Sequence, residues 1–208
     1  MNEPSFESDA WKKVTGLMGD HRGALGPRIS AELRRDPKRL GFVLSRYKFA
    51  AKMARRGGTV VELGCGEGLG SRILSEFAAG YTGVDSDSSA VASAQRDWGN
   101  EKTRFLEGSL LDGTFGRFDA LVCLDGLERV EARRRPDFAD AVARNLADDG
   151  ACVVGAPGGA ADGLQGLLRA VFHNVFMFGM NDEVVHTGLV PAAHYSIALG
   201  CNKIRRGS

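Results

Sequence analysis

The chain has 208 residues, of which 43% are hydrophobic, and its formal net charge at pH 7 is +1. A chain of this length buries a substantial core as one unit without disulfides or a structural metal. The near-neutral charge argues against a globally basic nucleic-acid binder and against an acidic disordered protein. No signal peptide is visible, and no apolar run approaches the roughly 20 residues that span a bilayer, so we expect a cytoplasmic protein without a membrane segment.

The four cysteines lie far apart in the sequence and form no CxxC pair. Three of them, Cys65, Cys123 and Cys152, fall within or beside apolar strand patterns, where a reduced thiol behaves as a small hydrophobic group. Asp125 and Glu128 are three residues apart, but a hard-cation site usually needs more oxygen ligands than this pair offers. We therefore expect reduced cysteines and no metal site.

The chain begins with a polar, glycine-rich stretch, which predicts an N-terminal arm or lid over residues 1–35 with one short helix near Ala10–Met18. A single domain is expected over residues 36–208. It starts with Asp36 as a helix cap and Pro37 in the first turn. Apolar residues then recur at helical spacing along one face up to Ala51.

A strand, a glycine turn and a helix N-terminus follow over residues 59–77. Thr59 to Val61 read as a short buried strand, and the next residues are Glu62-Leu63-Gly64-Cys65-Gly66-Glu67-Gly68. Glycines allow a ligand to approach the main chain closely. A phosphate-binding P-loop is excluded because no lysine follows the glycines, and a dinucleotide fingerprint is imperfect because Leu69 replaces its last glycine. The Glu62 carboxylate would repel a pyrophosphate but suits a cationic ligand such as S-adenosyl-L-methionine (SAM).

Three further strands end in short motifs downstream. The segments are Tyr81-Thr82-Gly83-Val84-Asp85, Phe105-Leu106-Glu107-Gly108-Ser109 and Phe118 to Asp125. Together with the glycine turn, they resemble, in the same order, the motifs of class I SAM-dependent methyltransferases. The resemblance implies that the carboxylate ending the second strand accepts hydrogen bonds from the ribose hydroxyls of SAM. Ser109 stands where that family usually has an acid beside the adenine.

A second resemblance covers most of the chain. The segments Asp36-Pro37-Lys38-Arg39-Leu40, Arg46-Tyr47-Lys48-Phe49 and Met180-Asn181-Asp182-Glu183-Val184-Val185-His186-Thr187-Gly188 are similar to those of a bacterial group of such methyltransferases. Most members of that group have no assigned substrate. The predicted cofactor contacts are Arg46, Tyr47, Glu62, Gly64, Cys65, Gly66, Asp85, Ser86, Ser109, Leu110 and Leu124.

The catalytic candidates are Asp125, at the end of the fourth strand, and His186, in the loop expected after the sixth strand. A histidine titrates near neutral pH and could take a proton from an acceptor hydroxyl. His194 is a second candidate for this contact. The wider family often has a histidine where this chain has Arg129, and the loop from Gly155 to Ala161 is short of polar side chains, so loss of catalysis is an open alternative.

The expected fold is an α/β Rossmann-like three-layer sandwich, with a mostly parallel seven-stranded sheet whose last strand is antiparallel. The expected function is transfer of a methyl group from SAM to an O or N atom of a small molecule, such as a sugar, a nucleoside or a secondary metabolite. A monomer or a homodimer is expected. The alternatives are a SAM-binding protein without transfer activity and an RNA or protein methyltransferase that uses the arginine clusters, although no aromatic stacking platform accompanies them.

Overall fold

The computed structural model describes residues 25–54, 57–158, 161–188 and 190–204. The helix expected near Ala10–Met18 lies outside the described residues. The helices are α2 (Pro27–Arg35), α3 (Lys38–Met53), α4 (Ser71–Leu74), α5 (Ser88–Trp98), α6 (Asp137–Asn145) and α7 (Ala161–Arg169), with three short 3-10 turns, η1 (Leu127–Arg129), η2 (Ala132–Arg134) and η3 (Val190–Ala192). The strands are β1 (Thr59–Leu63), β2 (Gly80–Asp85), β3 (Thr103–Glu107), β4 (Phe118–Leu124), β5 (Leu146–Pro157), β6 (Phe172–Asn181), β7 (Val184–His186) and β8 (Tyr195–Lys203).

The strands form one sheet in the order β3-β2-β1-β4-β5-β8-β6-β7. The first five are parallel, while β8 inserts antiparallel between β5 and β6. The Rossmann-like class and the antiparallel last strand are therefore confirmed. The predicted number of seven strands is wrong, because the segment after β6 turns back at Asp182 and pairs as an eighth strand, β7.

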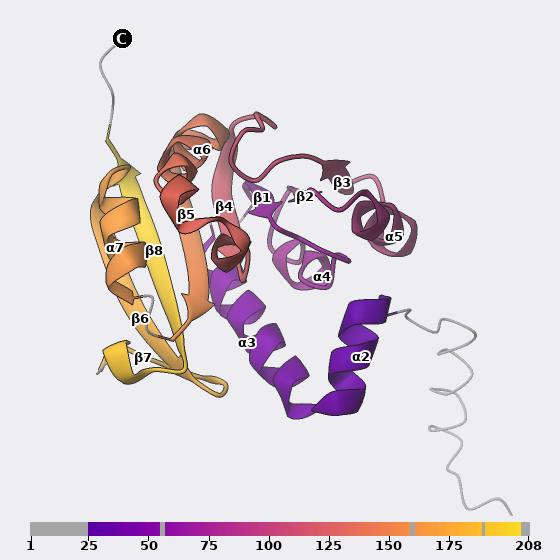
Figure 1. Ribbon diagram of the computed structural model, residues 1–208. Coiled ribbons are helices and arrows are strands. Elements are labelled where there is room, and N and C mark those ends of the chain that lie inside the picture. The colour runs from indigo at the N-terminus through magenta and orange to yellow at the C-terminus, as the bar shows by residue number, and fades with distance from the viewer. Residues whose placement is uncertain (1–24, 55–56, 159–160, 189, 205–208) are drawn as a thin grey trace, which may run out of the picture.

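Helices cover both faces of the sheet, as Figure 1 shows. On one face, α3, α4 and α5 bury residues such as Ala50, Leu74 and Ala94 against β1 and β2. On the other face, α6 and α7 bury Phe138 and Leu168 against β4 and β5. Within the described residues, no helix is both long and apolar enough to cross a membrane.

Most elements begin where the sequence indicates. Asp36 accepts a hydrogen bond from the backbone amide of Lys38 at 3.1 Å, at the start of α3. The Asp87 carboxylate caps α5 by accepting from the amides of Ser89 and Ala90. The helix expected from Leu69 to Phe77 is much shorter, since α4 spans only Ser71–Leu74.

The strand order reverses between β1 and β4, which lie next to each other although β2 and β3 come between them in the chain. In open α/β sheets, a ligand crevice lies beyond the carboxyl ends of the strands at such a switch point. The turns after β1, β2 and β4 therefore define the region to search for a site.

Candidate functional site

A cavity of about 470 Å³ lies at the switch point. The carboxyl ends of β1, β2 and β4 form its floor, α2 and α3 form one wall, and the start of β8 forms another. The lining residues include Arg28, Ile29, Glu32, Arg39, Phe42, Val43, Arg46, Tyr47, Gly64, Cys65, Gly66, Glu67, Leu69, Asp85, Asp87, Ala90, Leu124, Asp125, Glu128, Arg129, Pro157, His194 and Tyr195. A cavity of this size accommodates a small ligand, and its lining is unusually rich in charged groups.

The glycine turn follows β1 and is fixed to β2 by its backbone. The amides of Gly64 and Cys65 both donate to the carbonyl of Val84, at 2.8 and 3.0 Å. Gly66 has φ +52, and no described atom lies within 4 Å of the position that a Cβ there would occupy. The missing side chain at Gly66 therefore leaves open space inside the cavity, which a ligand could fill at close range to the main chain.

Asp85 ends β2 and orders two neighbouring turns. Its carboxylate accepts hydrogen bonds from the backbone amide of Gly66 at 2.8 Å and from that of Asp87 at 3.0 Å. The side chain is largely buried yet lines the cavity. It therefore combines a fixed position with oxygen lone pairs that still face the cavity.

Glu62 is fully buried in β1, where both carboxylate oxygens accept hydrogen bonds from tyrosines. Tyr47 donates to Oε1 at 2.7 Å, and Tyr81 donates to Oε2. Burial and the nearby Asp85 raise the pKa of Glu62 and the two tyrosine hydroxyls lower it, so that the net pKa is about 7. Glu62 does not line the cavity and supports the glycine turn from beneath, so its direct contact with a cationic ligand stays a prediction.

Arg46, Asp125 and Tyr195 meet in the wall of the cavity. Arg46 Nη1 lies 2.9 Å from Asp125 Oδ2, and the guanidinium stacks 3.7 Å from the centre of the Tyr195 ring. Asp125 has φ +59, a conformation that costs a non-glycine residue about 1–2 kcal/mol. The Tyr195 hydroxyl and Arg46 Nε are buried without a hydrogen-bond partner among the described residues. Strain and unpaired polar atoms gathered in one place are typical of a binding site.

Helix α2 closes one side of the cavity by binding the glycine turn. The Glu67 carboxylate accepts hydrogen bonds from the first amides of α2, those of Arg28 at 3.1 Å and Ile29 at 3.4 Å. An acidic group there also complements the positive end of the helix dipole. Arg28, Ile29 and Glu32 then line the cavity, so the end of the predicted N-terminal arm is part of the site.

The structure brings together most of the predicted contact residues. Arg46, Tyr47, Gly64, Cys65, Gly66, Asp85, Leu124 and Asp125 all line the cavity. Ser86, Ser109 and Leu110 do not. Ser86 is exposed after β2, whereas the Leu110 side chain packs below the turn, beside Gly64 and Gly126.

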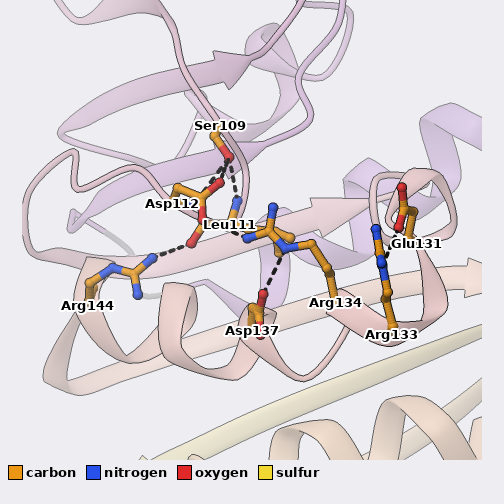
Figure 2. A network of polar contacts seen from close by, with 8 residues as sticks. All are labelled: Ser109, Leu111, Asp112, Glu131, Arg133, Arg134, Asp137 and Arg144. Carbon is orange, nitrogen blue, oxygen red and sulfur yellow. Dashed lines mark hydrogen bonds and ion pairs between the residues drawn. The ribbon is translucent and has the colours of Figure 1, made fainter.

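Ser109 belongs to a polar network outside the cavity (Figure 2). Its hydroxyl donates to Asp112 at 2.8 Å and accepts from the amides of Leu111 and Asp112. Arg134 bridges Asp112 and Asp137, and Arg144 donates to the Leu111 carbonyl. This network holds the loop after β3 against α6, so the Ser109 hydroxyl is not directed at the cavity.

The two histidine candidates differ in their distance from the cavity. His186 lies on β7, within 3.2 Å of the Asn181 side chain, and does not line the cavity, whereas His194 does. The contact of His186 with an acceptor therefore stays a prediction, whereas His194 lies at the cavity itself. Sequence reasoning also missed the cavity contacts of Glu67, Arg129 and Tyr195; the position of Tyr195 at the start of the final strand was the available signal.

The remaining chemical candidates are the cysteines, of which Cys65 lines the cavity, and the exposed arginines. Burial raises the pKa of Cys65, Cys123 and Cys152, so these thiols stay protonated, and no cysteine among the described residues is in a disulfide. Arg133 pairs with Glu131 at an exposed corner (Figure 2). In the described part of the chain, no group of three or more His, Cys, Asp or Glu side chains is placed to hold a metal ion.

Comparison with known families gives a match over part of the chain. Residues 60–150 match the family model described as a methyltransferase domain, and this range contains the glycine turn, Asp85 and Asp125. Those residues, less than half of the chain, are therefore similar to a methyltransferase domain. The chain is a methyl-transferring enzyme, and the glycine turn and Asp85 fit SAM as its methyl donor.

Solved structures show the same fold, and no curated protein has a matching sequence. A TehB-like SAM-dependent methyltransferase from Corynebacterium glutamicum is 22% identical with a TM-score of 0.65, over 84% of this chain and 96% of that one. The N-methyltransferase NodS from Bradyrhizobium japonicum, in complex with S-adenosyl-L-homocysteine (SAH), is 16% identical with a TM-score of 0.63, over 94% and 99%. The plantazolicin methyltransferase BpumL is 13% identical with a TM-score of 0.61, over 83% and 88%.

The buried Glu62 generates a prediction about stability and pH. Because its folded pKa is raised from 4.5 to about 7, its contribution to the free energy of unfolding is most favourable below pH 4.5 and falls as the pH rises through 7. The full loss is about 3 kcal/mol by linkage. Urea unfolding measured at pH 5 and at pH 8.5 should show that the free energy of unfolding falls more between these two pH values for the wild type than for Glu62→Gln. Equal losses would contradict the raised pKa.

The contact between Glu67 and α2 generates a second prediction. Glu67→Gln removes the charge that caps α2, so local opening of this helix should become easier by about 1 kcal/mol. Hydrogen exchange of the amides in residues 27–35 should accelerate about fivefold in this variant. The exposed Glu76→Gln is the matched control and should leave these amides unchanged. Unchanged exchange in Glu67→Gln would show that the contact does not hold α2.

Proposed function

We propose that this enzyme transfers the methyl group of SAM to an O or N atom of a small molecule, such as a sugar, a nucleoside or a secondary metabolite. The observation that carries the proposal is the convergence, in one cavity, of the open glycine turn, the fixed Asp85 carboxylate and the Arg46–Asp125 pair. The proposed acceptor is small because α2, held by Glu67, closes one side of the cavity.

The charges of the cavity match the functional groups of SAM. Asp85 is proposed to accept hydrogen bonds from the ribose hydroxyls, and the backbone of Gly64 and Gly66 to lie against the cofactor. Arg46 would pair with the methionine carboxylate through the donor capacity that its contact with Asp125 leaves unused. Cys65, Tyr47 and Leu124 supply uncharged surface at the same wall.

The protein's main task is alignment. When bound, SAM supplies an electrophilic methyl group: an acceptor lone pair forms the new bond to carbon as the carbon–sulfur bond breaks and its electron pair returns to sulfur. A cavity that holds the acceptor in line with that bond supplies most of the rate acceleration by proximity. The acceptor's proton would leave to solvent or to a base at the cavity wall.

Residues at the acceptor side are proposed to be Asp125, His194 and Tyr195. Burial raises the pKa of Tyr195, so the hydroxyl keeps its proton at neutral pH and is available to donate a hydrogen bond. His194 is an exposed cavity residue whose neutral imidazole would serve as a proton acceptor. Asp125 is proposed to act mainly through Arg46, since the two side chains form an ion pair.

The family resemblance also bears on the group, the oligomeric state and the cellular location of the enzyme. We propose membership of the bacterial group marked by the segments at residues 36–40, 46–49 and 180–188, with a monomer or homodimer acting in the cytoplasm. An assay of SAH release against panels of sugars, nucleosides and small amines tests the function. Turnover with at least one class supports it. SAM binding without turnover on any panel would instead favour a binding protein.

The proposed role of Asp85 predicts a selective loss of cofactor binding. Asp85→Asn removes the charge that favours the ribose hydroxyls, so the dissociation constant for SAM, measured by calorimetry, should rise about 10-fold to 100-fold. Asp148→Asn, at an exposed ion pair with Arg117, is the control and should bind SAM as the wild type does. Normal SAM affinity in Asp85→Asn would count against the assignment.

The unpaired hydroxyl of Tyr195 predicts that function and stability respond differently to its removal. Tyr195→Phe keeps the ring that Arg46 stacks on but deletes a buried hydroxyl without a partner, so urea unfolding should show an unchanged or slightly raised stability. The kcat/KM for methyl transfer should fall about 10-fold, the value of one lost hydrogen bond. A destabilised variant with wild-type turnover would assign the hydroxyl a structural role.

A further inference from the structure

A second cavity, of about 740 Å³, opens next to the first at the carboxyl ends of β4 and β5. It lies on the sheet face that α6 and α7 cover, between the segment after β4 and one side of α7. The two helices contact each other further along, and Figure 1 shows both on the same side of the sheet. The proposed function assigns no role to this cavity.

The lining of the second cavity is mostly apolar, and its charged members are Glu128 and Arg135. Leu127, Ala139, Ala156, Leu164 and Leu167 contribute to it from four different elements. Gly166 lies among them on α7, and no described atom comes within 4 Å of the position of a Cβ there. Glycine inside a helix is less favourable than alanine by roughly 1 kcal/mol, so this position keeps the cavity wide at the expense of helix stability.

The two cavities share a wall made of Glu128 and Pro157, both of which line each cavity. Among the described residues, Glu128 is in no ion pair, and its carboxylate accepts a hydrogen bond from its own backbone amide. Arg28 and Arg129 are near enough to act on its charge but do not pair with it. The Glu128 carboxylate lies between a polar cavity and an apolar one. It is therefore placed to bind the positively charged group of a ligand whose apolar part occupies the second cavity.

We propose that the second cavity binds the apolar part of the methyl acceptor, and that the acceptor is an amphipathic small molecule whose ammonium group lies beside Glu128. The ammonium passes one proton to this carboxylate or to solvent, which frees the nitrogen lone pair for methyl transfer. This inference rests on the proposed function and narrows its substrate class to apolar amines. The continuity of the cavities through Glu128 and Pro157 places the amine end of such a molecule toward the cavity that contains Gly66 and Asp125.

The test uses N-phenyl-1-naphthylamine, a neutral dye that fluoresces in apolar sites, and the full-length protein with SAH present. The dye should bind the wild type, and octylamine should displace it at a concentration at least about 100-fold lower than ethylamine, because six more methylenes are buried. Octanoate has the same chain length and the opposite charge, so it should compete at least about 10-fold less well than octylamine. Glu128→Gln should remove this difference.

Two variants of α7 locate the binding. Gly166→Leu adds a side chain to the cavity at a position free of clashes and improves helix propensity, so the variant should fold normally, with a melting temperature at or above that of the wild type. Its affinity for the dye and for octylamine should fall at least about 10-fold. Gln165→Leu, on the same helix but outside the cavity lining, is the matched control and should bind as the wild type does.

Several results would overturn the inference. The wild type could fail to bind the dye, or Gly166→Leu could bind it as the wild type does. Ethylamine or octanoate could also compete for the dye as well as octylamine does. Dye binding that falls as protein concentration rises would assign the cavity to a second copy of the chain instead. Calorimetry with SAM on the same preparations separates the two claims. Normal SAM binding with a negative dye result rejects only the apolar acceptor, whereas absence of SAM binding rejects the proposed function itself.

Discussion

The buried carboxylate of Glu62 connects the three elements that form the floor and wall of the site. It lies in β1 immediately before the glycine turn, and the hydroxyls that it binds come from Tyr47 on α3 and Tyr81 on β2. A buried acid is tolerated only when its oxygens are hydrogen-bonded, so the positions of α3 and β2 relative to β1 are strictly set. The same tyrosine of α3 lines the cavity with its neighbour Arg46, so one interaction in the core positions a functional surface.

The site above the Glu62 carboxylate is formed by several backbone turns that are distant in sequence. Asp85 ties the glycine turn to the start of α5, and Glu67 ties the same turn to α2. Each carboxylate has a structural bond to a backbone amide and also lines the cavity. Binding of a cofactor would therefore act on both α2 and the turn after β2, and we expect the two to become more rigid together.

The sequence predicted the parts of the site that follow from local patterns. The glycine turn, Asp85 and Asp125 each stand at the end of an apolar strand, and parallel strands bring their carboxyl ends to one edge. It could not place α2 in the wall, because the bonds from Arg28 and Ile29 to Glu67 span 39 and 38 residues. It could not place the two histidines either, since His186 lies on the additional strand β7, whereas His194 lies at the cavity just before β8. The role of Glu62 was missed because its tyrosine partners are distant in sequence.

Calorimetric titration of the purified chain with SAM, and separately with NADH, tests the central claim most directly. Both ligands contain adenosine, so a general affinity for nucleotides would appear in both titrations. We expect saturable binding of SAM and no detectable binding of NADH, because the glycine turn lacks the dinucleotide pattern and lies near the carboxylates of Glu67, Asp85 and Asp87. Binding of NADH, or no binding of SAM, would contradict the account and leave a Rossmann-like fold with a different ligand.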